Sequence, residues 1–344
     1  MPRFKLKHYI NYIVITLFLI VMMILSSNGM LPRATITLLS RIAYSIILAV
    51  SLNLVVGFLG ELSLGHAGFM CVGAYIGCYF ANFLHTVIGS PLVVLILSML
   101  VGGLVAAVFG FIIGLPALRL KGDYLAIVTL AFGEIIRNVI NCLYISLDGQ
   151  RLHIAFNNPN VAGKLLVNGP AGATGVNKMA TFGMGFALTL FTLFVVLNLI
   201  DSRSGRAIMA IRDNRIAAEA MGLNVTKYKM MAFVTSAVLA GMAGALYGLN
   251  FSTVAASKFK FDTSILVLVF VVLGGIGNIR GSIISATLLT ILPELLRAFA
   301  NYRMLIYAIV LILVMLATNN PTLRGMMERI IPCGKGRKKE ADEA

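Results

Sequence analysis

The sequence has little charge for its length, few cysteines and no recognisable metal-binding spacing. Only 12% of the 344 residues are charged, about half the share that a soluble domain carries. This scarcity excludes an ordinary soluble globular protein. Of the four cysteines, three lie inside apolar runs, where a thiol behaves as a small hydrophobic group. We therefore assign the cysteines no chemistry and expect no metal site.

Motifs that would indicate catalysis are also missing. Neither a His-Glu-x-x-His zinc motif nor a Gly-x-Ser-x-Gly nucleophile turn occurs. His66 stands in a glycine-rich stretch without an adjacent base, so packing or hydrogen bonding is favoured over contact with a substrate. The phosphate-binding sequence Gly-x-x-x-x-Gly-Lys-Ser/Thr is absent too. The sequence thus indicates no enzyme, no catalytic residues and no cofactor bound by this chain.

What the sequence does contain is a series of long apolar runs, with 59% hydrophobic residues. Lipid cannot hydrogen-bond the backbone, so each run is expected to form a helix. The fold class is therefore an all-α polytopic membrane protein. Glycine-rich stretches near 62–70 and 263–281 indicate broken or re-entrant helices. About ten transmembrane helices are predicted, near 9–31, 35–57, 63–84, 91–115, 123–145, 180–200, 231–250, 263–277, 282–299 and 303–318.

The two ends of the chain differ in character. Residues 9–31 follow three basic residues and are long enough to span a bilayer, which favours an uncleaved anchor over a cleaved signal peptide. Residues 335–344 form a charged tail without an apolar face and are expected to be disordered. The transmembrane domain is accordingly assigned to residues 1–334.

Lys and Arg are unevenly distributed between the loops that these spans define. The net charge of +15 does not indicate a nucleic-acid partner, because the basic residues lie at the ends of apolar runs. Cytoplasmic loops retain positive charge, and an inside N-terminus places most Lys and Arg on that side. Both termini and loop 201–230 are therefore predicted to be cytoplasmic. Loop 146–179 is predicted to be external and turn-rich, with or without a binding partner.

The charged segment Asp201–Lys229 lies between two apolar runs. Its basic residues alternate with Ala and Ile in the pattern of an amphipathic helix. Outside the bilayer, the apolar stripe of such a helix is covered either by a partner protein or by anionic membrane lipid. A protein partner is favoured.

Polar residues that fall in or near apolar runs are candidates for function. Glu134 and Arg137 stand three residues apart and can pair on one helix face, for structure or along a substrate route. Nearby glycines allow either close helix packing or a helix break beside a pathway. The candidate substrate-path residues are Asn53, Ser63, His66, Thr129 and Glu134.

Four blocks of sequence resemble the permeases of branched-chain amino-acid ABC importers. They are Asn53–Phe69, Leu118–Leu130, Ser204–Gly222 and Leu273–Leu296. The run Leu-Arg-Leu-Lys-Gly-Asp-Tyr in the second block is similar to the M-type permease rather than its H-type counterpart. The resemblance covers nearly the whole span region. It implies the fold of type II ABC importer permeases and a prokaryotic plasma (inner) membrane location.

The resemblance also implies partners. These are an H-type permease in a heterodimer, two ABC ATPase subunits that hold ATP and Mg, and an extracytoplasmic substrate-binding protein. Closure of the ATPases would drive alternating access through the 205–222 loop, with Gly205 and Gly222 as its flexible ends. The predicted ATPase-coupling residues are Gly205, Arg206, Arg212, Ala217, Ala218, Glu219, Ala220 and Gly222.

The cargo and the energy source each have an alternative. A branched-chain amino acid is the expected substrate, and urea or an amide is the alternative for the same type of permease. A gradient-driven secondary carrier is the alternative mechanism, because carboxylates near the apolar runs could couple ion movement to transport. Those carboxylates are Glu61, Glu134 and Glu294.

Overall fold

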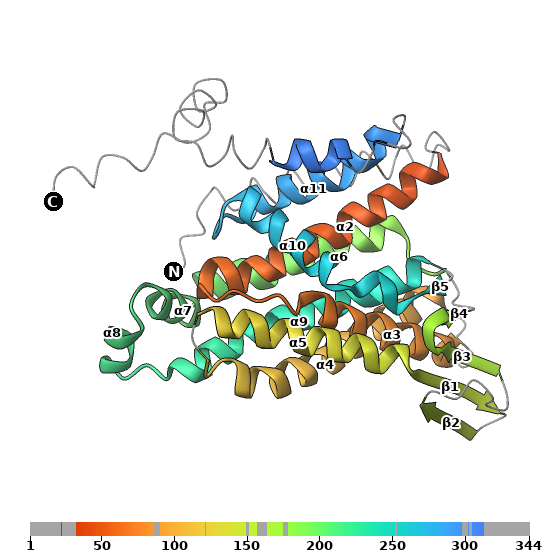
Figure 1. The fold of residues 1–344 in the computed structure, drawn as a ribbon, viewed down its shortest axis with the longest axis horizontal. Helices are drawn as coiled ribbons and strands as arrows, with labels where there is room; N and C mark the ends of the chain where they lie inside the picture. The colour runs from red at the N-terminus through yellow and green to blue at the C-terminus, as the bar shows by residue number, and fades with distance from the viewer. Residues whose placement is uncertain are drawn as a thin grey trace. The chain divides into compact units, whose positions relative to one another are not determined.

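The computed structural model describes residues 22, 32–85, 90–120, 122–148, 151–156, 164–174, 178–251, 253–297, 302 and 305–312. Helices dominate this part of the chain, which confirms the all-α membrane class (Figure 1). The chain divides into two compact units, Met1–Thr290 and Ile291–Ala344. In the described part of the second unit, residues 305–312 are helical and Arg297 pairs with Glu294 across 3.2 Å. The helices and strands that end before residue 290 belong to the first unit.

Among the described residues, six helices are long and apolar enough to cross a membrane. The first, α2 (Arg33–Asn53), continues into a π-helical segment, η1 (Leu54–Leu59). These six match six of the predicted spans. Of the predicted span 9–31 only residue 22 is described, of 303–318 only residues 305–312 are described, and the tail 335–344 lies wholly outside the described residues. The other five helices are α3 (His66–His85), α4 (Pro91–Ala117), α5 (Asp123–Asn141), α6 (Phe182–Asp201) and α9 (Val225–Asn250).

The two glycine-rich stretches interrupt helices, as predicted. Helices α10 (Phe261–Gly274) and α11 (Ile279–Leu295) have 14 and 17 residues, fewer than the roughly 20 that span a bilayer. Between them, Gly275 and Gly277 adopt positive φ angles of 89° and 79°. Similarly, η1 ends at Gly60 with φ 78°, and residues 61–65 are not helical before α3 begins. We call residues 60–65 the first break and residues 275–278 the second break.

Small residues set the packing of the central helices. Helices α3, α4 and α9 make the most extensive contacts and lie side by side in Figure 1. A Cβ atom on Gly73 of α3 would lie 2.0 Å from the carbonyl oxygen of Gly241 in α9. Lipid gives helices no hydrophobic drive to associate, so close van der Waals contact between small residues holds them together. The α3–α4–α9 core therefore depends on its glycines.

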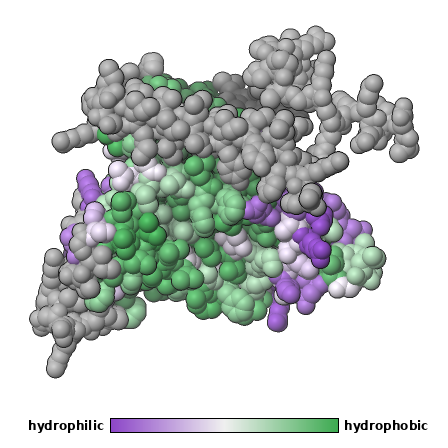
Figure 2. Space-filling model, turned by 180° about the vertical axis from the view of Figure 1, so that it is seen from behind, coloured by the Kyte–Doolittle hydropathy of each residue, from purple (hydrophilic) through white to green (hydrophobic). Residues whose placement is uncertain are grey.

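Large apolar side chains cover the outside of the bundle. Figure 2 shows hydrophobic residues across the middle of one face, with hydrophilic residues toward its margins. On α4 the exposed apolar residues recur every four positions. A stripe of this length would be unfavourable in water but is solvated by lipid hydrocarbon. The residues of the stripe are Leu92, Ile96, Leu100, Leu104, Val108 and Ile112.

The predicted external loop forms most of a small antiparallel sheet rather than turns alone, and its last strand, β5, comes from the residues after α9. The strand order is β2-β1-β3-β4-β5. The first strand was not predicted, because the apolar run up to residue 145 resembles a continuous helix, whereas α5 ends at Asn141. Backbone N–H groups of Met179 and Ala180 donate to the Leu249 carbonyl oxygen and join the end of this loop to α9. The strands are β1 (Leu143–Asp148), β2 (Arg151–Phe156), β3 (Lys164–Asn168), β4 (Gly172–Thr174) and β5 (Thr253–Val254).

The charged segment lies at the other end of the bundle from this sheet. It contains helices α7 (Arg203–Asp213) and α8 (Arg215–Ala220), which Figure 1 shows beyond the ends of the long helices. The loops predicted to be cytoplasmic and external are thus at opposite ends of the first unit, as an arrangement across a membrane requires.

The packing predicts a large effect of a single methyl group at Gly73. Gly73→Ala places a Cβ where the Gly241 carbonyl oxygen stands, so α3 and α9 must separate. We expect a loss of about 1–3 kcal/mol in the free energy of unfolding, which is typical of overpacking. The measurement is thermal unfolding of the purified protein in detergent. Ala131→Val, on the exposed face of α5, is the control, and equal stability of the two variants would contradict the role of Gly73.

Candidate functional site

The charged segment predicted as one amphipathic helix forms two short helices, α7 and α8, and the start of a third, α9. The single-helix prediction is wrong because Asn214 leaves the helical conformation, with φ −153° and ψ 103°. Its side-chain oxygen accepts a hydrogen bond from Ala217 N at 3.0 Å. Asn at this position satisfies an N–H group at the start of a helix that otherwise has no partner. Ser202 and Asn224 cap α7 and α9 in the same way.

A small hydrophobic cluster holds α7, α8 and the start of α9 together. Its buried members are Ile211, Ala218 and Val225, one from each helix, and Leu223 and Tyr228 pack against them. Beside the cluster is an open hollow of about 430 Å³. The hollow is lined by Ala210, Asp213, Asn214, Ala217, Ala218, Met221 and Leu223.

Helix α8 presents apolar side chains at an exposed tip. Ile216 of α8 is 81% exposed and Met221, directly after this helix, is 83% exposed. Neither side chain is buried against the membrane helices. Outside the spanning helices, large apolar groups this exposed are typical of a binding surface. Six of the eight predicted coupling residues are exposed, whereas Ala218 is buried in the cluster described above and Gly205 is buried in α7. The exposed six are Arg206, Arg212, Ala217, Glu219, Ala220 and Gly222.

The two glycines predicted as flexible ends behave differently. Gly205 lies inside α7, where an added Cβ would be 2.2 Å from the carbonyl oxygens of Leu199 and Ile200. The prediction of a flexible end at Gly205 is therefore wrong, because this glycine permits a close contact with the end of α6. Gly222 follows α8 with φ 79° and ends that helix, a conformation that glycine adopts readily.

The arginines of the segment divide their contacts between the surface and the bundle. Arg215 pairs with Glu219 across 2.9 Å on the surface of α8, and Arg206 donates to the Asp201 carbonyl oxygen. Arg212 instead reaches toward the membrane helices. Its Nη1 donates to the Gly57 carbonyl oxygen in η1 at 3.0 Å.

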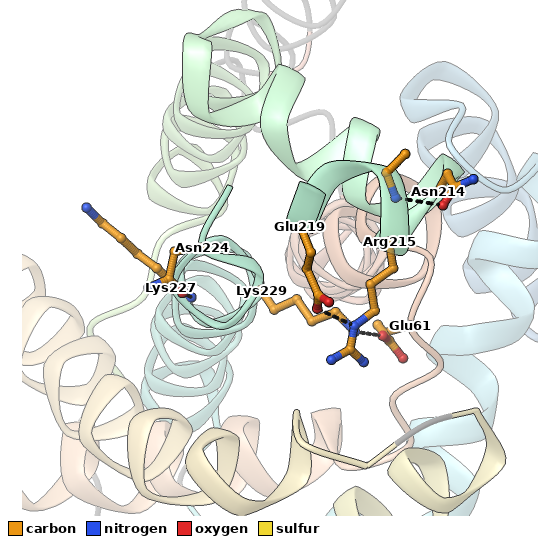
Figure 3. A network of polar contacts seen from close by, with 8 residues as sticks. Glu61, Asn214, Arg215, Glu219, Asn224, Lys227 and Lys229 are labelled. Atoms are coloured by element: carbon orange, nitrogen blue, oxygen red, sulfur yellow. Dashed lines mark hydrogen bonds and ion pairs between the residues drawn. The ribbon is translucent and has the colours of Figure 1, made fainter. Parts of the chain in front are cut away.

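An ion pair joins the first break to α9. The Lys229 ammonium group contacts the Glu61 carboxylate (Figure 3). The two side chains are only 5% and 14% exposed, and removing either partner would leave the other charge with little access to water. Glu61 was predicted as an ion-coupling candidate, whereas Lys229 was placed in the charged segment Asp201–Lys229 without a partner in the bundle. Its position just before the apolar run from residue 230 is the signal that could have identified it.

Asn53 holds the second break. Its Oδ1 accepts from Gly277 N at 2.9 Å, and its Nδ2 donates to Ser282 Oγ at 2.9 Å. The Asn53 side chain is fully buried, so these bonds replace those that water would provide. Gly57, one helical turn further along, lies against the backbone of Gly277.

His66 is buried at the start of α3 and is engaged within the protein. Its Nε2 lies 2.8 Å from Ser51 Oγ, and Ser236 donates to the Ser51 carbonyl oxygen at 2.6 Å. This agrees with the hydrogen-bonding role favoured for His66. The next residue, Ala67, donates its N–H to Ser264 Oγ of α10 at 3.0 Å.

Thr129 and Glu134 of α5 each accept a hydrogen bond from the backbone of a neighbouring segment, the first break and the start of α10. Thr129 Oγ1 accepts from Leu64 N at 3.1 Å within the first break. Glu134 pairs with Arg137 across 2.8 Å, as predicted, and its Oε1 also accepts from Phe261 N at the start of α10 at 3.0 Å. Ser63 is buried in the first break.

The five path candidates thus lie within one of the two helix breaks or contact residues at a break or at the start of a helix. Asn53, His66, Thr129 and Glu134 each have hydrogen-bonding partners within the chain. Their contact with a substrate stays a prediction. Buried hydroxyl groups that the sequence analysis did not single out complete these contacts, and a serine in an otherwise apolar helix is the signal for them. They are Ser51, Ser236, Ser264 and Ser282.

Comparison with known proteins gives a family match over most of the chain. Residues 34–315 match the family described as "Branched-chain amino acid transport system / permease component". The chain is 32% identical to "High-affinity branched-chain amino acid transport system permease protein LivM" of Escherichia coli (strain K12), over 87% of this chain and 73% of that protein. It is 33% identical to the LivM protein of Salmonella typhimurium (strain LT2), over 84% of this chain and 69% of that protein.

The H-type counterpart is more distant. The LivH protein of Escherichia coli (strain K12) is 28% identical over 78% of this chain and 88% of that protein. No solved structure matches significantly.

A double-mutant cycle tests the bond between Asn53 and Ser282. Asn53→Ala, Ser282→Ala and the double variant are compared by thermal unfolding in detergent. We expect an interaction energy of about 0.5–3 kcal/mol, because Ser282→Ala leaves the buried Asn53 Nδ2 group without its partner and Asn53→Ala removes the same bond. Additive effects within about 0.5 kcal/mol would contradict the contact.

Proposed function

The chain belongs to the family of branched-chain amino acid transport permeases, as a LivM-like member, and we propose that ATP-driven ABC ATPase subunits act on it through α8. The observation that carries this proposal is the exposed apolar tip of α8. Ile216 and Met221 project from a capped, cluster-supported helix beside an open hollow. A tip of this kind fits a groove on a protein partner, with the Arg215–Glu219 pair at its rim.

The proposed assembly follows from the family. The chain pairs with an H-type permease, and two ATPase subunits, with ATP and Mg, dock on the end that carries α7 and α8. An extracytoplasmic substrate-binding protein delivers cargo at the end that carries the β1–β5 sheet. The excess of Lys and Arg on the α7–α8 side supports a cytoplasmic location for both termini. The expected site is the plasma (inner) membrane of a prokaryote.

The proposed mechanism is alternating access. ATPase closure displaces α7 and α8, and their displacement tilts the attached helices so that the pathway opens toward the other side. The hydrophobic cluster of Ile211, Ala218 and Val225 supports this step because it makes α7, α8 and the start of α9 move together.

The contacts of the carboxylates disfavour the gradient-driven alternative. Glu61 pairs with Lys229, Glu134 with Arg137 and Glu294 with Arg297. A carboxylate that couples transport to an ion must exchange that ion during the cycle. A basic partner beside each of these three carboxylates opposes the binding of a cation.

Substitution of Ile216 tests the docking surface. Ile216→Asp places a charge in an apolar interface, and we expect the amount of ATPase that co-purifies with the permeases to fall by about tenfold or more. Ile216→Leu keeps the apolar contact and is the control. Because Ile216 is exposed, neither change should affect insertion of the permease. Undiminished co-purification with Ile216→Asp would contradict docking through α8.

Uptake by the reconstituted complex tests the cargo and the energy source. Proteoliposomes with both permeases, the ATPases and the binding protein receive labelled leucine, isoleucine, valine, urea or acetamide. We expect ATP-dependent import of the three amino acids and none of urea or acetamide. Import that follows a proton or sodium gradient and ignores ATP would refute the ABC mechanism, and import of urea or acetamide alone would refute the proposed cargo.

A further inference from the structure

Three side chains connect the α7–α9 region to the first break. Glu61 lies in the break itself and pairs with Lys229 near the start of α9, whereas Arg212 in the last turn of α7 binds η1 just before the break. We call Glu61, Lys229 and Arg212 the clasp. The clasp joins the proposed docking helices to the membrane segment where the helix is interrupted.

The contacts of Arg212 fix the end of η1 in two ways. Its Nη1 donates to the Gly57 carbonyl oxygen at 3.0 Å, and a cation near the C-terminus of a helix is favoured by the carbonyl dipoles there. The aliphatic part of the side chain covers Gly60, where a Cβ atom would lie 2.5 Å from Arg212 Cγ. Asp213 accepts from Arg212 Nε and Nη2 at 3.0 and 2.9 Å, which orients the guanidinium group.

The ion pair adds a second connection that water screens little. Figure 3 shows Lys229 extending from α9 to Glu61, while Lys227 in the same helix points away. At 5% and 14% exposure, the paired side chains attract each other more strongly than a surface pair does. A movement of α7 and the start of α9 therefore has two routes to the same break.

From the first break, the contacts continue to the second. A Cβ atom on Gly57 would lie 2.4 Å from Gly277 N, so the two backbones touch. Asn53, one turn before Gly57, binds both Gly277 and Ser282. A displacement at the clasp thus reaches the α10–α11 turn through η1 without passing through the closely packed α3–α4–α9 core.

We propose that the clasp transmits the movement of α7 and α8 to the two helix breaks, so that Glu61, Lys229 and Arg212 couple ATP hydrolysis to substrate movement. They are positioning residues, because they act through the breaks and not on the substrate. The inference rests on the proposed function, and it adds the route by which the docked helices move the membrane segment.

The test compares the number of leucine molecules imported per ATP hydrolysed by the full complex in proteoliposomes. Glu61→Gln/Lys229→Gln removes both charges and leaves no unpaired buried ion. We expect its ATPase subunits to stay attached and its import per ATP to fall about tenfold, within the usual range of coupling between sites. Arg212→Leu should also lower the number of leucine molecules imported per ATP.

Two matched variants separate coupling from general effects of charge or structure. Lys227→Gln removes a charge from the same turn of α9 without touching Glu61 and should keep the wild-type ratio. Lys229→Arg preserves the charge pair and should keep most of the wild-type import per ATP. A purely structural pair would allow Glu61→Gln/Lys229→Gln to import at the wild-type ratio, because both charges are removed together.

The outcomes distinguish this inference from the proposed function. If the wild-type complex shows no ATP-dependent import, the proposed function fails and the inference fails with it. If the wild-type complex imports leucine and Glu61→Gln/Lys229→Gln retains the wild-type ratio, only the clasp is refuted. Failure of that variant to assemble with the ATPases would also refute the clasp, because the pair would then serve assembly rather than coupling.

Discussion

A helix that breaks inside a bilayer leaves backbone N–H and C=O groups without water, and the protein has to provide their partners. This constraint organises the polar interior of the permease. Gly277 N binds Asn53, Leu64 N binds Thr129, and Ala67 N binds Ser264. On the carbonyl side, Gly57 accepts from Arg212. Several polar side chains that lie deep in the apolar sequence therefore support interrupted backbone, whatever else they do in transport.

The same constraint separates the bundle into two kinds of packing. In the α3–α4–α9 core, backbones meet through small residues such as Gly73 and Gly241, and the contact has no side chain that could rearrange. At the breaks, several contacts depend on one or two hydrogen bonds between the backbone and the side chain of Asn53, Thr129 or Arg212. A close-packed contact resists small displacements, whereas a few hydrogen bonds can exchange. Movement is therefore easier at the breaks than in the core.

Apolar length and glycine content were sufficient to predict six membrane helices and both interruptions, because those features depend on local sequence and on the solvent. Helix ends were less predictable. Asn214 divides the charged segment because its side chain caps α8, a local signal that the overall amphipathic pattern concealed. The Glu61–Lys229 pair joins residues 168 positions apart, and periodicity carries no information about such a contact. Gly205 was misassigned for a related reason, since glycine suits both flexible ends and close contacts.

Alternating access requires an element with two arrangements and an input that favours one of them. The two breaks can provide the element with two arrangements. Their backbone is hydrogen-bonded by side chains that can rotate, and their glycines tolerate positive φ. Within the described residues, the carboxylates Glu61 and Glu134 are already paired with basic groups, so an input from ion binding at them would have to separate these pairs first. An input through α8 does not meet this obstacle, because its apolar tip is exposed and its supporting cluster connects it to α7 and α9. The pairing of these carboxylates and the exposed tip of α8 therefore both support the proposal that the driving partner docks outside the membrane.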